Sequence, residues 1–109
     1  MPTGQATPPV EPIYSMFRDE DDFRELLEDF VGNVAVRRDV LRSSYTQGQI
    51  GTVRVQAHQL KGAGGGYGFE GLSELAARLE EACQRSEPDV NEIGPLLDNL
   101  VDYLSRVTV

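Results

Sequence analysis

Residues 57–69 read AHQLKGAGGGYGF and contain the only histidine of the chain, a lysine three residues after it and a dense run of glycines. His58 and Lys61 are embedded in a pattern of apolar and small residues that recur in steps of three and four, which is typical of a helix packed in a bundle. The pattern consists of Ile50, Val53, Ala57, Leu60 and Gly64. It predicts a helix over residues 49–64, which the glycine run then ends. His58 lies just outside this seam, so we expect its side chain to face solvent.

Three other segments have the period of a helix with one apolar face. They predict helices over residues 20–44 and 71–86, and a last one that starts at a cap on Asp89 or Asn91 and continues to about residue 107. The three apolar faces consist of Phe23, Leu26, Leu27, Phe30, Val31, Val34, Leu41 and Tyr45; of Leu72, Leu75, Ala76, Leu79, Ala82 and Cys83; and of Ile93, Leu96, Leu97, Leu100, Val101, Leu104 and Val107.

Polar residues at the helix starts predict how the helices are capped. Asp19 can accept hydrogen bonds from free amides of the first helix, and residues 46–49 fit a capping box before the second. Pro95 is tolerated only near the first turn of the last helix. No segment alternates in the manner of a strand. Four amphipathic helices joined by short loops bury their faces best side by side, so we predict an all-α, up-down antiparallel four-helix bundle.

The bulk composition is that of one globular domain. The chain has 109 residues, of which 39% are hydrophobic and 26% charged, as in ordinary soluble domains. Its net charge of −8 argues against nucleic acid and anionic membranes as partners. The single cysteine, Cys83, is expected to be a buried core residue in a reducing compartment. With no long apolar run and no signal peptide in the sequence, we expect a cytoplasmic protein.

The first residues differ from the rest of the chain. Residues 1–12 carry four of the six prolines and little to bury, so we expect a disordered tail before a bundle domain over residues 13–109. The N-terminal methionine and this tail favour a free-standing protein. The domain opens with a short apolar segment that we expect to lie across one end of the bundle and that contains Ile13, Tyr14, Met16 and Phe17.

Two interpretations of the central stretch compete. In the plainer one, His58 is an ordinary surface residue, Lys61 is a solvated charge and the glycines are a helix stop. Against it, Gly62 and Gly64 fall where helix is still predicted, and each costs about 1 kcal/mol relative to alanine. Bare backbone beside the histidine would let another molecule approach closely, which would offset that cost. An exposed imidazole is a nucleophile near neutral pH, and Lys61 can reach an anion carried by the ring.

The sequence His58-Gln59-Leu60-Lys61-Gly62, with Gly68 ten residues after the histidine, resembles the signature of histidine-containing phosphotransfer (HPt) domains. The resemblance covers about residues 13–107. It implies a relay module of a multistep two-component phosphorelay, in which a phosphoryl group passes between a receiver-domain aspartate and Nε2 of the histidine. For this chain it implies a phosphoacceptor, His58; a phosphoryl-stabilising residue, Lys61; an access and docking surface of Val55, Gln59 and Gly62; and a structural turn at Gly68.

The resemblance also bears on the surroundings of the histidine and on its partners. In some relatives a carboxylate of the next helix orients the imidazole; Glu80 stands at that place, and a solvated charge on the helix face is the alternative. Another relative uses a second histidine on that helix, and this chain has Ala77 at that position.

The implied partners are a response-regulator receiver domain and a histidine kinase, which can be a hybrid kinase. We expect a monomer that binds no metal or cofactor and has no catalytic machinery of its own, with Mg²⁺ on the receiver.

Two other functions stay open at this point. The first is a helical adaptor that docks a receiver or kinase through the same surface without carrying phosphate. The second is a hydrolase that uses His58 as a base, which the lack of a neighbouring serine, cysteine or metal constellation disfavours. Residues 64–66 lack the Gly-Lys-Ser/Thr ending of a nucleotide-binding loop.

Overall fold

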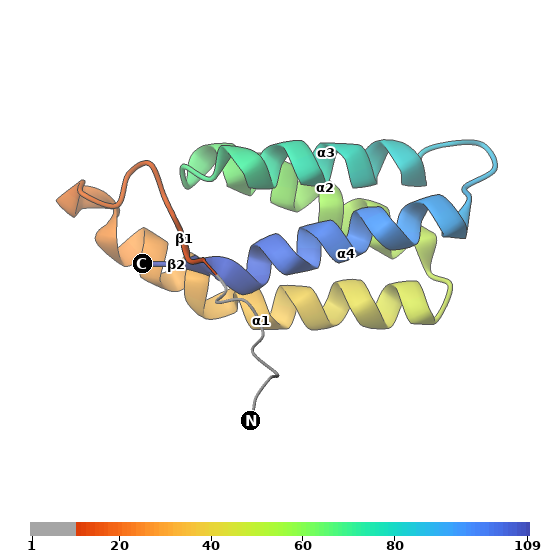
Figure 1. Ribbon diagram of the computed structural model, residues 1–109, viewed down its shortest axis with the longest axis horizontal. Helices are drawn as coiled ribbons and strands as arrows, with labels where there is room; N and C mark the ends of the chain where they lie inside the picture. Colours follow the sequence, from red (N-terminus) through yellow and green to blue (C-terminus); the bar gives the residue numbers. More distant parts are fainter. Residues whose placement is uncertain (1–10) are drawn as a thin grey trace, which may run out of the picture.

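The computed structural model describes residues 11–109 (Figure 1). Its four helices are α1 (Arg24–Thr46), α2 (Ile50–Gly66), α3 (Glu70–Cys83) and α4 (Val90–Arg106). The helices run alternately in opposite directions (Figure 1). Each packs against its neighbour in sequence, and α1 also packs against α4. The prediction of an all-α, antiparallel four-helix bundle is confirmed.

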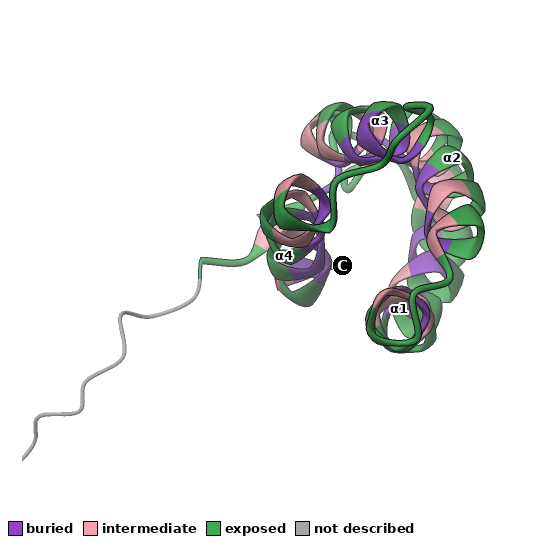
Figure 2. Cartoon of the chain, turned by 90° about the vertical axis from the view of Figure 1, so that its right-hand side faces the viewer, coloured by how far each residue is buried: buried purple, intermediate pink, exposed green. Residues whose placement is uncertain are grey.

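The core is built from the predicted apolar faces, which turn toward the inside of the bundle in each helix (Figure 2). Two positions differ from the prediction. Leu26 is 48% exposed, because its neighbour Leu27 takes the core position on α1. Phe69, which belongs to no predicted face, is buried in the turn before α3 and lies against Phe30. The largest fully buried side chains are Phe69, Leu41, Leu60, Leu72, Leu79, Ile93, Leu100, Leu104 and Val53.

The starts of the first two helices are not capped as predicted. Asp19 is not a cap, because Asp21–Phe23 form a short 3-10 turn (η1) from which α1 continues without a side-chain cap. The capping box is not formed, since Thr46 is the last residue of α1 and Gln49 precedes α2 without a side-chain cap bond. The connection turns at Gly48 instead, whose φ of 74° favours glycine.

The start of α4 follows one of the two predicted alternatives. The side chain of Asp89 is the cap and accepts a hydrogen bond of 2.9 Å from the amide of Asn91. Pro95 lies inside the second turn of α4, where it withdraws only the amide that would bond to the carbonyl of Asn91. The other helix ends differ by a few residues from the predicted 64 and 86: α2 extends to Gly66 and α3 ends at Cys83.

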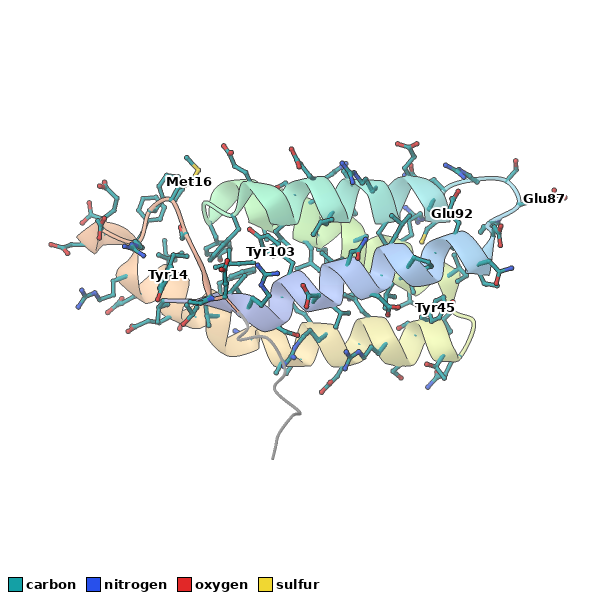
Figure 3. The ribbon with its side chains drawn as sticks, viewed as in Figure 1. Tyr14, Met16, Tyr45, Glu87, Glu92 and Tyr103 are labelled. Atoms are coloured by element: carbon teal, nitrogen blue, oxygen red, sulfur yellow. The ribbon has the colours of Figure 1, made fainter. Side chains whose placement is uncertain are left out.

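The segment from Ile13 to Phe17 crosses the end of the bundle where α2 turns into α3 (Figures 1 and 3), as predicted. It begins with β1 (Ile13–Tyr14), which pairs in parallel with β2 (Val107–Thr108) directly after α4. The prediction that the chain has no strand is therefore wrong for these two-residue strands. Their pairing joins the two ends of the domain, which no local pattern in the sequence reveals.

Hydrogen bonds fix this segment to the turn between α2 and α3; Ile13 also packs on the core and Phe17 stacks on Phe23, whereas Met16 is 65% exposed. The buried hydroxyl of Ser15 donates to the carbonyl of Tyr67 at 2.6 Å, and the amide of Met16 donates to the carbonyl of Gly68 at 2.9 Å. Gly68 has a φ of 80°, and a Cβ there would come within 2.5 Å of the Ser15 hydroxyl. The turn between α2 and α3 therefore requires glycine at this position.

The part of the chain before β1 is described only from Glu11 onward. The carbonyl of Glu11 accepts a hydrogen bond of 3.0 Å from Nε of Arg106. Residues 1–10, which make up most of the predicted tail, lie outside the described residues. Within residues 11–109, no helix combines the length and the apolarity needed to cross a bilayer.

Candidate functional site

The site lies on the side of α2 that borders α3, and the two helices pack against each other (Figure 2). Val53, Ala57 and Leu60 of α2 are completely buried. His58, outside that seam, has a side chain that is 65% exposed, so the predicted exposure of the imidazole is confirmed. Lys61 lies three residues further along α2 and therefore on the same side of the helix, with its side chain 42% exposed.

Glu80 of α3 connects these two side chains. One carboxylate oxygen, Oε2, lies 2.7 Å from Nδ1 of His58, and the other, Oε1, lies 2.7 Å from Nζ of Lys61. The side chain of Glu80 is only 7% exposed. The alternative interpretation of Glu80 as a solvated charge on the helix face is therefore wrong. A carboxylate this buried is stable because both of its oxygens have charged or hydrogen-bonding partners.

The partners of Glu80 decide its protonation state. The hydrogen bond from Lys61 lowers the pKa of the Glu80 carboxyl; burial raises it, and the hydrogen bond with His58 lowers it further, with a net result below the usual value of 4.5. Glu80 is thus ionised at neutral pH. An ionised carboxylate only accepts hydrogen bonds, so Nδ1 of His58 must donate. A neutral imidazole with its proton on Nδ1 carries its lone pair on Nε2.

The predicted docking residues are accessible on the outer side of α2. Gln59 and Val55 are both exposed. A Cβ added to Gly62 would meet no atom within 4 Å, so the backbone beside the imidazole is open. We call the surface formed by Val55, His58, Gln59 and Gly62 the open face of α2. It offers a partner a close approach to the ring from outside the bundle.

Gly64 has a different role from the one that the sequence suggested. Its position is buried, and a Cβ there would lie 2.6 Å from the backbone nitrogen of Ser73 and 2.9 Å from the carbonyl oxygen of Phe69. The room beside Gly64 is therefore filled by α3 and is not open to another molecule. The expectation that Gly64, like Gly62, bares backbone for an external partner is wrong. Gly64 lets α2 and α3 pack closely.

Sequence reasoning missed Ser73. Its hydroxyl donates a hydrogen bond of 2.7 Å to the backbone carbonyl of Lys61. Ser73 precedes Glu80 by seven residues, which is two turns of α3, so both lie on the side of α3 that borders α2. That spacing was the available signal, but it becomes informative only once Glu80 is known to face α2.

Cys83 lies on α3 near this region and is a free, buried cysteine, as predicted for a core residue. Burial raises the pKa of its thiol, and the charge of Arg54 opposes this only in part. The thiol is therefore protonated at neutral pH, which makes it a poor nucleophile. Among residues 11–109, no group of three or more histidine, cysteine, aspartate or glutamate side chains is placed to hold a metal ion.

Comparison with known proteins adds one finding to this geometry. Searches among curated proteins and among solved structures returned no match. The sequence model of the family described as Hpt domain matches residues 25–107, which is most of the chain and includes α2, α3 and almost all of the bundle. The chain therefore belongs to the Hpt domain family, whose members carry phosphoryl groups on histidine in two-component signalling.

Proposed function

We propose that this chain is a histidine phosphotransfer protein that relays a phosphoryl group between a receiver-domain aspartate and His58 in a multistep phosphorelay. One observation carries the proposal: an exposed imidazole whose Nδ1 is held at 2.7 Å by a buried, ionised carboxylate. This arrangement leaves Nε2 as the nucleophile and presents it to solvent on the open face of α2.

The transfer step follows from this geometry. The lone pair on Nε2 attacks the phosphorus of a receiver's aspartyl phosphate, the N–P bond forms as the P–O bond breaks, and the aspartate leaves as a carboxylate. Nδ1 keeps its proton throughout. The ring gains positive charge as the N–P bond forms, and the Glu80 carboxylate stabilises that charge. The reverse step returns the phosphoryl group to an aspartate.

Lys61 and Gly62 contribute charge and access in this proposal. The ammonium of Lys61 is held beside the ring by Glu80 and is partly exposed, so it can neutralise the negative charge of the incoming phosphoryl group. Gly62 leaves the neighbouring surface flat enough for a receiver to dock. The remaining charge neutralisation would come from acidic residues and Mg²⁺ on the receiver.

The wider setting is part of the same proposal. The chain would act as a carrier without catalytic machinery of its own, accepting its phosphoryl group through a receiver that a histidine kinase phosphorylates. We further propose that it works as a cytoplasmic monomer, and that its acidic surface, with a net charge of −8, serves no nucleic acid.

The proposal is tested by incubating the protein with a receiver carrying labelled aspartyl phosphate. We expect label on this chain that is lost in acid and stable in base, as phosphohistidine is. A His58→Gln variant, checked for an unchanged helical spectrum and melting temperature, should take up none. Label on that variant would contradict the assignment.

A non-phosphorylated adaptor is the second candidate, because the open face of α2 would suit docking as well as transfer. It predicts that a receiver binds with equal affinity to the wild type and to a His58→Gln variant, and that no phosphate is transferred to either. Titration of the receiver against both proteins therefore separates the two functions.

A further inference from the structure

The half of α2 that follows His58 is unusually poor in side chains. After Lys61 the helix consists of Gly62, Ala63, Gly64, Gly65 and Gly66. Each glycine inside a helix costs about 1 kcal/mol relative to alanine, because it loses more backbone freedom on folding. Isolated from the bundle, this part of α2 would fray. It is helical to Gly66 nevertheless, so contacts from outside the helix must hold it.

Those contacts come from α3 and from the turn that leads into it. The hydroxyl of Ser73 donates to the carbonyl of Lys61 at 2.7 Å, and the amide of Phe69 donates to the carbonyl of Gly64 at 2.7 Å. The missing side chain at Gly64 lets the backbone of Ser73 come close to α2. The glycine-rich end of α2 is therefore held by hydrogen bonds from Ser73 of α3 and from Phe69 in the turn before α3, and not by its own side chains.

Lys61 is consequently bonded to α3 at both ends. Ser73 holds its backbone carbonyl, and two turns further along α3 Glu80 holds its ammonium group. Glu80 uses its second oxygen to hold the ring of His58. The position of Glu80 relative to the ring thus depends on the alignment of α2 with α3, and Ser73 makes the side-chain hydrogen bond that sets this alignment at Lys61.

We propose that Ser73 is a positioning residue of the phosphotransfer site. Its hydroxyl fixes α2 against α3 so that Glu80 can contact both the ring of His58 and the ammonium of Lys61. The expected effect of Ser73 on transfer kinetics rests on the proposed function. Ser73 is only partly exposed and lies between the helices, outside the open face of α2, so it acts on the transfer step and not on docking.

The test compares Ser73→Ala with the wild type in three measurements. In transfer from a phosphorylated receiver, kcat should be lower by roughly three- to tenfold, which corresponds to the free energy that one hydrogen bond contributes. KM should be unchanged. The ¹⁵N shifts of the His58 ring, measured without phosphate, should move from the Nδ1–H form toward a mixture of tautomers. Amide exchange at Gly65 and Gly66 should become faster.

Two further variants serve as controls. Ser105→Ala removes a hydroxyl that donates at 2.8 Å to the carbonyl of Val101 on α4 and accepts at 2.9 Å from Arg38. It makes the same substitution away from the site and should leave kcat and the ring shifts unaltered. Ser73→Thr keeps the hydroxyl and should retain most of the wild-type kcat.

The inference is overturned if Ser73→Ala leaves both kcat and the ring shifts at their wild-type values. It is also overturned if Ser105→Ala or Ser73→Thr loses as much as Ser73→Ala. A wild-type protein that takes up no phosphate would contradict the relay itself. In that case the ring shifts and the amide exchange still decide whether Ser73 positions Glu80.

Discussion

Replacing Glu80 by glutamine should slow phosphoryl transfer to His58 by about 30-fold. The carboxylate lies 2.7 Å from Nδ1, and it stabilises the positive charge that the ring gains as Nε2 bonds to phosphorus. Two unit charges about 4 Å apart interact by about 4 kcal/mol at an effective dielectric constant of about 20. Glutamine keeps an oxygen that accepts the Nδ1 proton, which is worth roughly half of that figure. The remaining loss of about 2 kcal/mol corresponds to about 30-fold in rate.

The assay is single-turnover transfer from a receiver carrying labelled phosphate, with the receiver at saturating concentration so that docking does not limit the rate. Glu81→Gln is the matched control, because Glu81 is the next residue on α3, is exposed, and makes no ion pair among the described residues. It makes the same change of charge without touching the ring. A Glu80→Gln rate within threefold of the wild type, or an equal loss in Glu81→Gln, would refute the role given to Glu80.

Three other predictions concern stability. Gly62→Ala should raise the free energy of unfolding by about 0.5–1 kcal/mol, because a Cβ there meets nothing within 4 Å, and should raise the KM for the receiver; a urea melt showing destabilisation would contradict this. Gly64→Ala should lower the free energy of unfolding by roughly 1–3 kcal/mol, since its Cβ would lie 2.6 Å from the backbone nitrogen of Ser73; an unchanged melt would show that α3 does not press on this position. The hydrogen bond from Lys61 holds the pKa of Glu80 in the folded protein below its usual value of 4.5. The stability that the ionised Glu80 contributes is therefore complete above pH 4.5 and is lost as the pH falls through the lowered pKa of the folded protein. Urea unfolding of the wild type and Glu80→Gln should therefore converge on acidification, and a difference that stays constant with pH would argue against the ionised carboxylate.

The helices and the exposure of the histidine could be predicted because both depend on local periodicity. The apolar residues of α2 recur along the helix in steps of three and four, and that period alone places Val53, Ala57 and Leu60 inside and His58 outside. Helix ends were less predictable. Thr46 and Gln49 have the spacing of a capping box, but α1 continues through Thr46 and leaves no room for the box to form.

Contacts between helices could not be predicted from the period of either one. Gly62 and Gly64 look alike in the sequence, but α3 fills the space at Gly64 and leaves it empty at Gly62. Glu80 had two open interpretations because its burial depends on how α3 faces α2. Ser73 donates its hydrogen bond to a backbone carbonyl, and every residue has such a carbonyl. No residue type in the sequence therefore marks the acceptor.

The most direct test of the account is a ¹⁵N spectrum of the His58 ring before and after addition of a phosphorylated receiver. We predict a ring protonated on Nδ1 and held by Glu80 before addition, and a phosphoryl group on Nε2 with Nδ1 still protonated afterwards. A phosphoryl group on Nδ1, or a resting ring protonated on Nε2, would contradict the claim that Glu80 leaves Nε2 as the nucleophile.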